Sequence, residues 1–290
     1  MNSKNYIIYS LYSKFFFMIK YKLKKFEYAT RLLFVNSLTF VNKSPIIVEY
    51  PKSGGTWLAQ LIAGSLDIPF PRNTYPKLVK SVYHSHYLPK FLIKENKNII
   101  WLLRDGRDIM VSSYFHHLIW NDKNRKDKKL VDYYRGKLNF DDFDDIKTNL
   151  PVYIDFLFKN TPSKMTFFNH PGNWGDYNKA WLNFYRTRKN IYLVRYEDLL
   201  EDTYKEIEKL NREFLGVQIN EKSDLEKIIK KYSFENQTKR KRGNENTTSF
   251  LRKGIVGDWK NYFNEDAKSI FKKHHGEILI ELGYEKDLNW

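Results

Sequence analysis

The sequence predicts an α/β fold in three layers, a central parallel sheet flanked by helices, and three observations favour it. Short apolar, β-branched runs are each followed by apolar residues at helical spacing, within residues 45–65, 99–114 and 191–216. Parallel strands require such crossover helices between them. The 290 residues are 42% hydrophobic, which suits one sizeable domain. We therefore expect residues 43–290 to form a single domain, with its ligand beyond the carboxyl ends of the strands.

Composition narrows the function without fixing it. The formal net charge is +16, from 50 Lys and Arg against 34 Asp and Glu. Such a charge favours an anionic partner, which could be a nucleotide, a nucleic acid or a membrane surface. The chain has no cysteine, which excludes disulfides, thiolate nucleophiles and Cys-ligated zinc. A cytoplasmic location is the simplest expectation.

Residues 1–42 are expected to form an N-terminal aromatic and basic helical extension. Residues 6–19 are strongly apolar and aromatic but interrupted by Lys14, and four lysines lie within residues 20–25. The uninterrupted apolar stretch is shorter than the roughly 20 residues that cross a bilayer, and no signal-peptide cleavage site follows. Two interpretations stay open. A helix packed on the domain is favoured over a peripheral anchor, formed by residues 6–34, at the inner face of a membrane.

The first strand, turn and helix predict an anion-binding cradle. The apolar run 45–48 leads into a turn whose glycines let backbone amides approach an anion, where hydroxyls and a helix N-terminus can also bind it. Lysine stands first in this turn, whereas a Walker A loop has it near the end. An ordinary strand-to-helix turn is the alternative. The turn residues are Lys52, Ser53, Gly54, Gly55, Thr56 and Trp57.

The next two predicted strands carry histidines and an arginine. His84 and His86 are spaced so that a strand points both rings to one face, which could suit a metal, but without an obvious third ligand we expect none. Arg104 follows the run 99–103, and Ser112 lies two helical turns further on. An arginine fork and a hydroxyl suit a phosphate monoester. Alternatively, Arg104 caps its strand through Asp108.

Further along the chain, residues 191–199 predict a strand, and a helix follows until Gly216. Near the C-terminus, two adjacent cations and a flexible glycine predict a clamp for a second phosphate: Arg252, Lys253 and Gly254. The scattered histidines 170, 274 and 275 are expected at the surface.

Together these stretches resemble the cytosolic-type sulfotransferases, which use 3′-phosphoadenosine 5′-phosphosulfate (PAPS). Residues 50–57 read Tyr-Pro-Lys-Ser-Gly-Gly-Thr-Trp against the family's Tyr-Pro-Lys-Ser-Gly-Thr-Thr-Trp, residues 104–112 resemble Arg-x-Pro-x-Asp-x-x-x-Ser, and residues 252–260 match Arg-Lys-Gly-x-x-Gly-Asp-Trp-Lys. Residues 84–89 resemble Lys-Thr-His-Leu-Pro, and residues 196–199 match Tyr-Glu-Asp-Leu. We expect a microbial member of this family.

The resemblance implies a role for each matching residue. The turn from Lys52 to Trp57 would wrap the 5′ phosphosulfate, Lys52 would stabilise the leaving oxygen, and His86 would be the catalytic base. The 3′ phosphate would meet Arg104, Ser112, Arg252, Lys253 and Gly254. Aromatic rings would line the adenine pocket: Trp57, Tyr196 and Phe234. Three positions depart from the family pattern, since Gly55 replaces threonine, Gly106 replaces proline or alanine, and His84 replaces lysine.

We therefore expect a metal-independent enzyme that moves a sulfuryl group in line from PAPS to a hydroxyl or amine of a small-molecule, glycan or lipid acceptor, leaving 3′,5′-bisphosphoadenosine (PAP). Nucleic acid is not an expected partner, and the family's dimer motif is absent after Lys260, so the oligomeric state is left open. Two alternatives remain. One is a P-loop nucleotide phosphotransferase, which the lysine-first order argues against; the other is a non-catalytic basic protein that binds nucleic acid or membrane.

Overall fold

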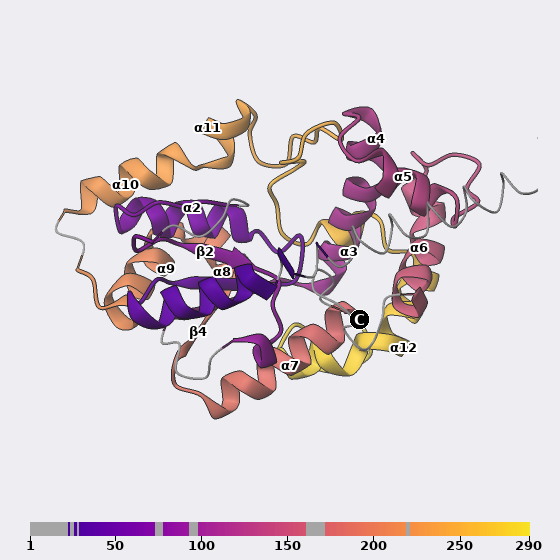
Figure 1. Cartoon of the computed structure of the whole chain (residues 1–290). Helices are drawn as coiled ribbons and strands as arrows, with labels where there is room; N and C mark the ends of the chain where they lie inside the picture. The colour runs from indigo at the N-terminus through magenta and orange to yellow at the C-terminus, as the bar shows by residue number, and fades with distance from the viewer. Residues whose placement is uncertain are drawn as a thin grey trace, which may run out of the picture.

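The computed structural model describes residues 23, 26, 27, 29–72, 78–92, 98–160, 172–218 and 221–290. A four-stranded sheet lies at its centre, with every neighbouring pair parallel and the order β2-β1-β3-β4 (Figure 1). The predicted parallel α/β sheet is thereby confirmed. The strands are β1 (Ile46–Glu49), β2 (Tyr83–Ser85), β3 (Ile99–Leu103) and β4 (Ile191–Arg195).

Helices connect and cover these strands. The α-helices are α2 (Gly55–Ser65), α3 (Gly106–Tyr114), α4 (Asn121–Lys123), α5 (Lys128–Arg135), α6 (Ile146–Asn160), α7 (Trp174–Thr187), α8 (Tyr196–Glu201), α9 (Thr203–Leu210), α10 (Lys222–Lys231), α11 (Phe234–Thr238) and α12 (Glu265–Glu281). Two 3-10 turns, η1 (Pro89–Phe91) and η4 (Asp258–Asn261), and two π-helical turns, η2 (Phe115–Trp120) and η3 (Asn211–Leu215), complete the described elements.

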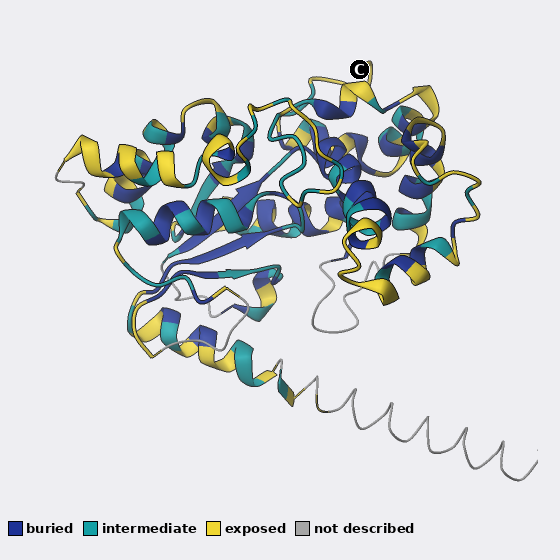
Figure 2. Cartoon of the chain, turned by 90° about the horizontal axis from the view of Figure 1, so that it is seen from above, coloured by how far each residue is buried: buried dark blue, intermediate teal, exposed yellow. Residues whose placement is uncertain are grey.

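Alternate strand residues fill two separate cores, one on each face of the sheet. Ile46, Val48 and Trp101 pack with residues of α3, α6, α7 and α12. Ile47 and Ile100 point the other way and pack with residues of α2, α9 and α10. Because side chains alternate along a strand, a sheet that is apolar on both faces must be covered twice. The result is the predicted three layers, and the strands are seen as the buried middle of the domain in Figure 2.

The strand order reverses between β1 and β3. The chain leaves β1 for its neighbour β2 on one side, then returns to β3 on the other side and continues outward to β4. The segments that follow β1 and β3 therefore leave the sheet next to each other, and parallel α/β sheets bind their ligands at this kind of reversal. The predicted turn at Lys52 and the predicted arginine, Arg104, both lie here.

The described part of the N-terminal extension packs on the domain. Residues 29–41 are helical, and one face of this segment buries Val35, Asn36 and Thr39. Asn36 donates from Nδ2 to the carbonyl of Phe91 at 2.9 Å. Residues 1–22, which include most of the proposed anchor, lie outside the described residues. None of the helices in the described ranges has the length and apolar composition to span a bilayer.

Candidate active site

The turn between β1 and α2 is held in an unusual backbone conformation. Lys52 has a φ of 76° and Gly54 a φ of 105°, both in the left-handed region. A Cβ added at Gly54 would lie 2.9 Å from the ring of Tyr196, so only glycine fits. Ser53 is buried and donates from Oγ to the carbonyl of Tyr50 at 2.8 Å. The hydroxyl of Ser53 therefore stabilises the turn, whereas the sequence suggested it as a ligand of the anion.

Lys52 is the cation at the centre of the site. Burial lowers the pKa of its ammonium group to about 7, and the positive charges of Arg104 and Arg252 act in the same direction. Glu49 opposes this shift without reversing it. Nζ of Lys52 lies 4.2 Å from the centroid of the Phe250 ring. A bound anion would favour the charged form of Lys52, because an opposite charge raises the pKa of a buried amine.

Arg104 joins the first motif to the third. Its Nη1 donates to the carbonyl of Lys52 at 3.1 Å, and its Nη2 donates to the carbonyl of Ile255 at 3.4 Å. Its guanidinium also lies 4.2 Å from the centroid of the Tyr196 ring. The alternative interpretation, a pairing with Asp108, is present only as a contact of 3.7 Å. Arg104 therefore organises the backbone around the site with most of its contacts.

Asp258 holds the two cations of the clamp. Lys253 donates to its Oδ1 at 2.6 Å, Arg252 donates to its Oδ2, and the amide of Asn261 adds a third bond at 2.8 Å. Arg252 also pairs with Glu245. Burial alone would raise the pKa of Asp258, but these donors outweigh it and the pKa is lowered. The clamp is thus preassembled on a buried carboxylate that sequence reasoning had not identified.

A second carboxylate ties the clamp to α3. The backbone amides of Gly257 and Trp259 donate to Asp108 at 2.8 and 2.9 Å. These two amides are two residues apart at the start of η4, so a single carboxylate fixes where the third motif sits. Asp108 is buried in α3, and its sequence context had suggested only a strand cap because these amides lie about 150 residues away.

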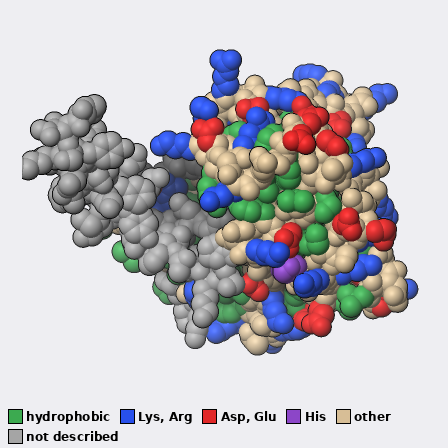
Figure 3. Space-filling view, turned by 90° about the vertical axis from the view of Figure 1, so that its right-hand side faces the viewer, with side chains coloured by type: hydrophobic (Ala, Val, Ile, Leu, Met, Phe, Trp, Pro, Cys, Tyr) green, Lys and Arg blue, Asp and Glu red, His purple; other side chains and the backbone are tan. Residues whose placement is uncertain are grey.

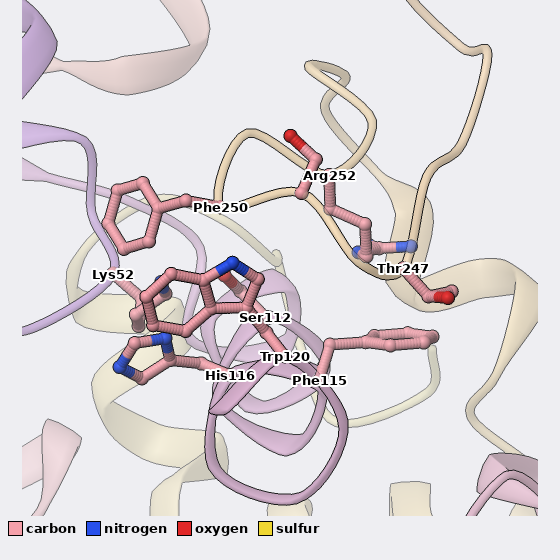
Figure 4. A pocket seen from close by; sticks show the side chains of 9 residues that line it. Lys52, Ser112, Phe115, His116, Trp120, Thr247, Phe250 and Arg252 are labelled. Carbon is pink, nitrogen blue, oxygen red and sulfur yellow. The ribbon is translucent and has the colours of Figure 1, made fainter. Parts of the chain in front are cut away.

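Predicted residues from all three motifs line one small pocket (Figure 4). Lys52, Ser112 and Arg252 supply its polar groups. His116 and Trp120, from η2, and Phe250 supply a cluster of rings, with His116 stacked on Trp120 at 5.0 Å between centroids. Burial, followed by the charge of Lys52, lowers the pKa of His116 to about 3, so this ring is neutral. The remaining lining residues are Phe115, Thr247 and Ser249.

His84 and His86 lie side by side against Glu49, as the His-x-His spacing predicted. Their ring centroids are 5.2 Å apart. Nε2 of His84 is 2.8 Å from Oε1 of Glu49, and Nδ1 of His86 is 3.0 Å from the main-chain carbonyl of Glu49. Since that carbonyl can only accept, Nδ1 of His86 carries the proton and Nε2 is left as the basic nitrogen. Burial and the charge of His84 lower the pKa of His86, which keeps it neutral.

The same three residues form a candidate metal site. One ligand atom from each of Glu49, His84 and His86 lies within 4.8 Å of the others. The sequence had suggested no third ligand, and Glu49 would be that ligand. However, Glu49 already accepts from His84 through one oxygen and from the amide of Gly55, at 2.5 Å, through the other. A metal would have to break the first bond, so the arrangement is better described as a hydrogen-bonded network.

The predicted adenine residues divide into two groups. Trp57 packs edge-on against Tyr196, with 5.9 Å between ring centroids. Phe234 lies against Gly254, where an added Cβ would be 2.5 Å from its ring. Phe234 therefore meets the site through the clamp, and Gly254, at a φ of 67°, is needed there for space as well as for conformation.

Helix α7 packs against residues 84–87, the segment that carries the two histidines. Trp181 donates from Nε1 to the carbonyl of Tyr87 at 3.1 Å, and the hydroxyl of Tyr177 donates to the same carbonyl at 3.3 Å. These two bonds give the helix a structural role. The expectation for His275 was wrong: it is buried against Trp174 and Phe271 in the second half of α12. Its polar neighbours in sequence, on the opposite face of the helix, had suggested a surface position.

Comparisons with known proteins identify the fold and the family. Residues 68–283 match the family model described as the sulfotransferase domain. The chain is 26% identical to cytosolic sulfotransferase 1 of Danio rerio over 281 residues, covering 82% of this chain and 84% of that protein. It is 28% identical to sulfotransferase 2A1 of Homo sapiens over 275 residues, covering 82% and 86%.

Solved structures show the same fold. A crystal structure of mouse sulfotransferase SULT7A1 complexed with PAP aligns with a TM-score of 0.53 and 22% identity, covering 85% of this chain and 88% of that one. A crystal structure of retinol dehydratase in complex with androsterone and the inactive cofactor PAP aligns with a TM-score of 0.57 and 15% identity, covering 87% and 85%.

Proposed function

The chain belongs to the sulfotransferase domain family, and from this premise we propose that it transfers a sulfuryl group from PAPS to a hydroxyl or amine acceptor. One observation carries the proposal. Lys52, Ser112 and Arg252, from three distant segments, line a single pocket beyond the carboxyl ends of β1 and β3. A donor with a phosphosulfate at one end and a phosphate at the other needs cations placed by separate elements in this way.

The donor would lie across the strand reversal. Its 5′ phosphosulfate would meet Lys52 and the N-terminus of α2, where the helix dipole favours an anion. Its adenine would lie by the Trp57 and Tyr196 rings. Its 3′ phosphate would meet the residues that the family pattern assigns to it: Arg104, Ser112, Arg252, Lys253 and Gly254. The phosphate would replace part of what Asp258 and Glu245 now provide to the clamp.

The transfer would proceed in line. The acceptor oxygen or nitrogen attacks sulfur while its proton passes to Nε2 of His86, and the bond from sulfur to the bridging oxygen breaks with its electron pair left on the 5′ phosphate. His86 is suited to this because it is neutral and its Nδ1 is held by the Glu49 carbonyl. Lys52 would stabilise the charge that develops on the bridging oxygen. No step requires a metal.

We propose a small apolar or aromatic molecule as the acceptor. The aromatic side chains of His116, Trp120 and Phe250 cluster beside Lys52, and such a cluster favours a flat or apolar substrate over a sugar. The neighbouring retinol dehydratase structures contain retinol or androsterone, which are molecules of this kind. On the face in Figure 3, Lys and Arg side chains are interspersed with acidic ones, which gives little support to a nucleic-acid surface there.

The proposal is tested by incubating the full chain with PAPS and a panel of phenols, alcohols and amines, and measuring PAP release together with the sulfated product. We expect PAP release that depends on the acceptor and is unchanged by EDTA. ATP with magnesium should give no transfer. Phosphoryl transfer from ATP, or PAP release that requires a divalent metal, would contradict the proposal and favour the phosphotransferase alternative.

We also propose that the N-terminal helix lies on an anionic membrane surface. Its outward face is an apolar stripe of Leu23, Phe26, Leu33, Phe34, Phe40 and Val41, and Leu33 is 65% exposed. At about 100° per residue, these side chains fall within one side of the helix. The lysines of residues 20–25 stand beside it in the sequence. Apolar and basic residues together are typical of interfacial helices. The helix is seen at the margin of the domain in Figure 2.

Vesicle cosedimentation tests this location. The full chain should pellet with vesicles that contain anionic lipid and stay in solution with neutral ones. A Leu33→Ser/Phe40→Ser variant should bind the anionic vesicles with an affinity at least about tenfold lower. Leu78→Ser is the matched control, because Leu78 is 83% exposed but lies elsewhere. Equal binding by both variants, or self-association of the wild type without vesicles, would contradict the membrane proposal.

A further inference from the structure

Glu49 contacts the start of α2 and both histidines of the site. It ends β1, directly before the turn, and is only 3% exposed. One carboxylate oxygen accepts from the amide of Gly55, the first residue of α2, and the other accepts from His84. Its main-chain carbonyl accepts from His86. The sequence suggested no role for Glu49, because these three contacts bring together segments that are 6 to 37 residues away.

A carboxylate at this place is unexpected beside an anion site. The Glu49 carboxylate accepts a hydrogen bond from the Gly55 amide at the N-terminus of α2, so this amide is not free to bind a phosphate, although such amides are the natural ligands of a phosphate. It also adds negative charge where an anionic donor would bind. Burial would raise the pKa of Glu49, but its interactions with His84 above all, and with His86 and the Gly55 amide, outweigh burial and lower it. Glu49 is therefore charged, and His84 is its side-chain hydrogen-bond partner.

Gly55 is explained by the same pair. A Cβ added at Gly55 would lie 2.5 Å from Cδ of Glu49 and 2.5 Å from Nε2 of His84. Real side chains do not approach so closely, and both neighbours are fixed by their bond to each other. The backbone of Gly55 is helical, so conformation does not require glycine here. The space taken by the Glu49–His84 pair does.

We infer that Glu49, paired with His84, is a positioning residue for the transfer, and that Gly55 lacks a side chain to make room for the pair. The pair holds the start of α2, and with it the turn that carries Lys52. It also fixes the Glu49 carbonyl that orients His86. Two departures from the family pattern, Gly55 and His84, would thus be one linked change, with Glu49 as the partner of both. This inference rests on the proposed function, since positioning has meaning only for a reaction in which Lys52 and His86 take part.

A substitution cycle tests the linkage. Gly55→Thr alone should weaken PAP binding and lower kcat/KM for PAPS, each by about tenfold or more, because the new side chain displaces the pair. Glu49→Thr/His84→Lys should lower kcat more than it weakens PAP binding, because His86 loses its fixed carbonyl. The combination of all three changes should be about as active as Glu49→Thr/His84→Lys, because Gly55→Thr then has no pair to displace. Gly64→Thr, in the same helix, is the control whose loss the changes at Glu49 and His84 should not recover.

The readouts separate this inference from the proposed function. If the wild type neither binds PAP nor uses PAPS, the proposed function fails, whereas the coupling in urea unfolding between position 55 and the Glu49–His84 pair can still be measured. If Gly55→Thr does not fold, Gly55→Ala takes its place in the cycle. Losses that simply add between position 55 and the pair would overturn the linkage. Coupled stability with an unchanged kcat in every folded variant would overturn the positioning role.

Discussion

The two cationic ends of the site are built in opposite ways. At the clamp, Arg252 and Lys253 are both paired with the buried Asp258, and Arg252 also with Glu245. At the turn, Lys52 has no comparable ion pair within the described part of the chain, and its pKa is lowered to about 7. Cations that only bind the nucleotide can be paired with internal carboxylates, which a bound phosphate can then replace. A cation that must stabilise charge developing in the transition state is left without an internal ion pair, so that it interacts with the bound anion.

The largest effect should follow removal of the base. His86→Ala should lower kcat by about 10²–10⁴, because proton transfer by a positioned base contributes that much, while PAP affinity stays unchanged. Steady-state kinetics and PAP titration measure the two quantities. His274→Ala, at an exposed position on α12, is the matched control. A His86→Ala variant with normal turnover would refute the base assignment.

Lys52→Ala should rank next. We expect kcat to fall by about 10²–10³, the usual cost of losing one group that stabilises developing charge. PAP affinity should fall by less than about tenfold, because the other cations still bind both phosphates. Lys137→Ala replaces an exposed lysine that does not line the pocket and should change neither quantity. Normal turnover by Lys52→Ala would remove the contrast between the two ends.

The clamp should show the reverse pattern. Arg252→Ala should weaken PAP binding by about 10-fold to 100-fold, which is what a charged hydrogen bond contributes, with a smaller loss in kcat. Isothermal titration with PAP and kinetics at saturating PAPS separate the two. Arg186→Ala, whose side chain is exposed and pairs with Glu281 at 3.5 Å, serves as the control. A loss confined to kcat would mean that the clamp takes part in the chemistry.

The smallest expected effect is the uptake of a proton by Lys52 when PAP binds. The pKa of Lys52 is about 7 in the folded protein, against the ordinary lysine value of 10.5, so between these pH values the free folded protein binds fewer protons than the unfolded chain. This group therefore makes the free protein more stable as pH rises through that range, whereas PAP, which favours charged Lys52, should bind less tightly. Isothermal titrations of the protein with PAP at about pH 8, in two different buffers, should reveal that PAP binding is accompanied by the uptake of up to about one proton. Lys52→Met should abolish it, and wild-type binding without proton uptake would contradict the pKa.

The local units of the fold could be predicted from the sequence, whereas the connections between them could not. The strands β1, β3 and β4 came from apolar periodicity and the start of α2 from paired glycines, which act over a few residues. The predicted strand 191–199 was too long, because it ends at Arg195 and Tyr196 begins α8. Asp258 was not singled out, although its partners lie only 3 to 6 residues away, because they sit in an irregular segment without periodicity. Asp108 was missed because it binds amides about 150 residues away. Glu49 was missed for the same reason. His275 was misplaced because the sequence around it is polar, although its own side of α12 is buried.

The central claim is a site for a nucleotide with both 5′ and 3′ phosphates. Thermal unfolding of the full chain with PAP, and separately with 5′-AMP, ADP and ATP plus magnesium at matched ionic strength, tests it most directly. Ligand at about 100 times its dissociation constant adds about 2.7 kcal/mol, which should raise Tm by several degrees. We expect stabilisation by PAP alone. Equal stabilisation by all four nucleotides, or by none, would contradict it.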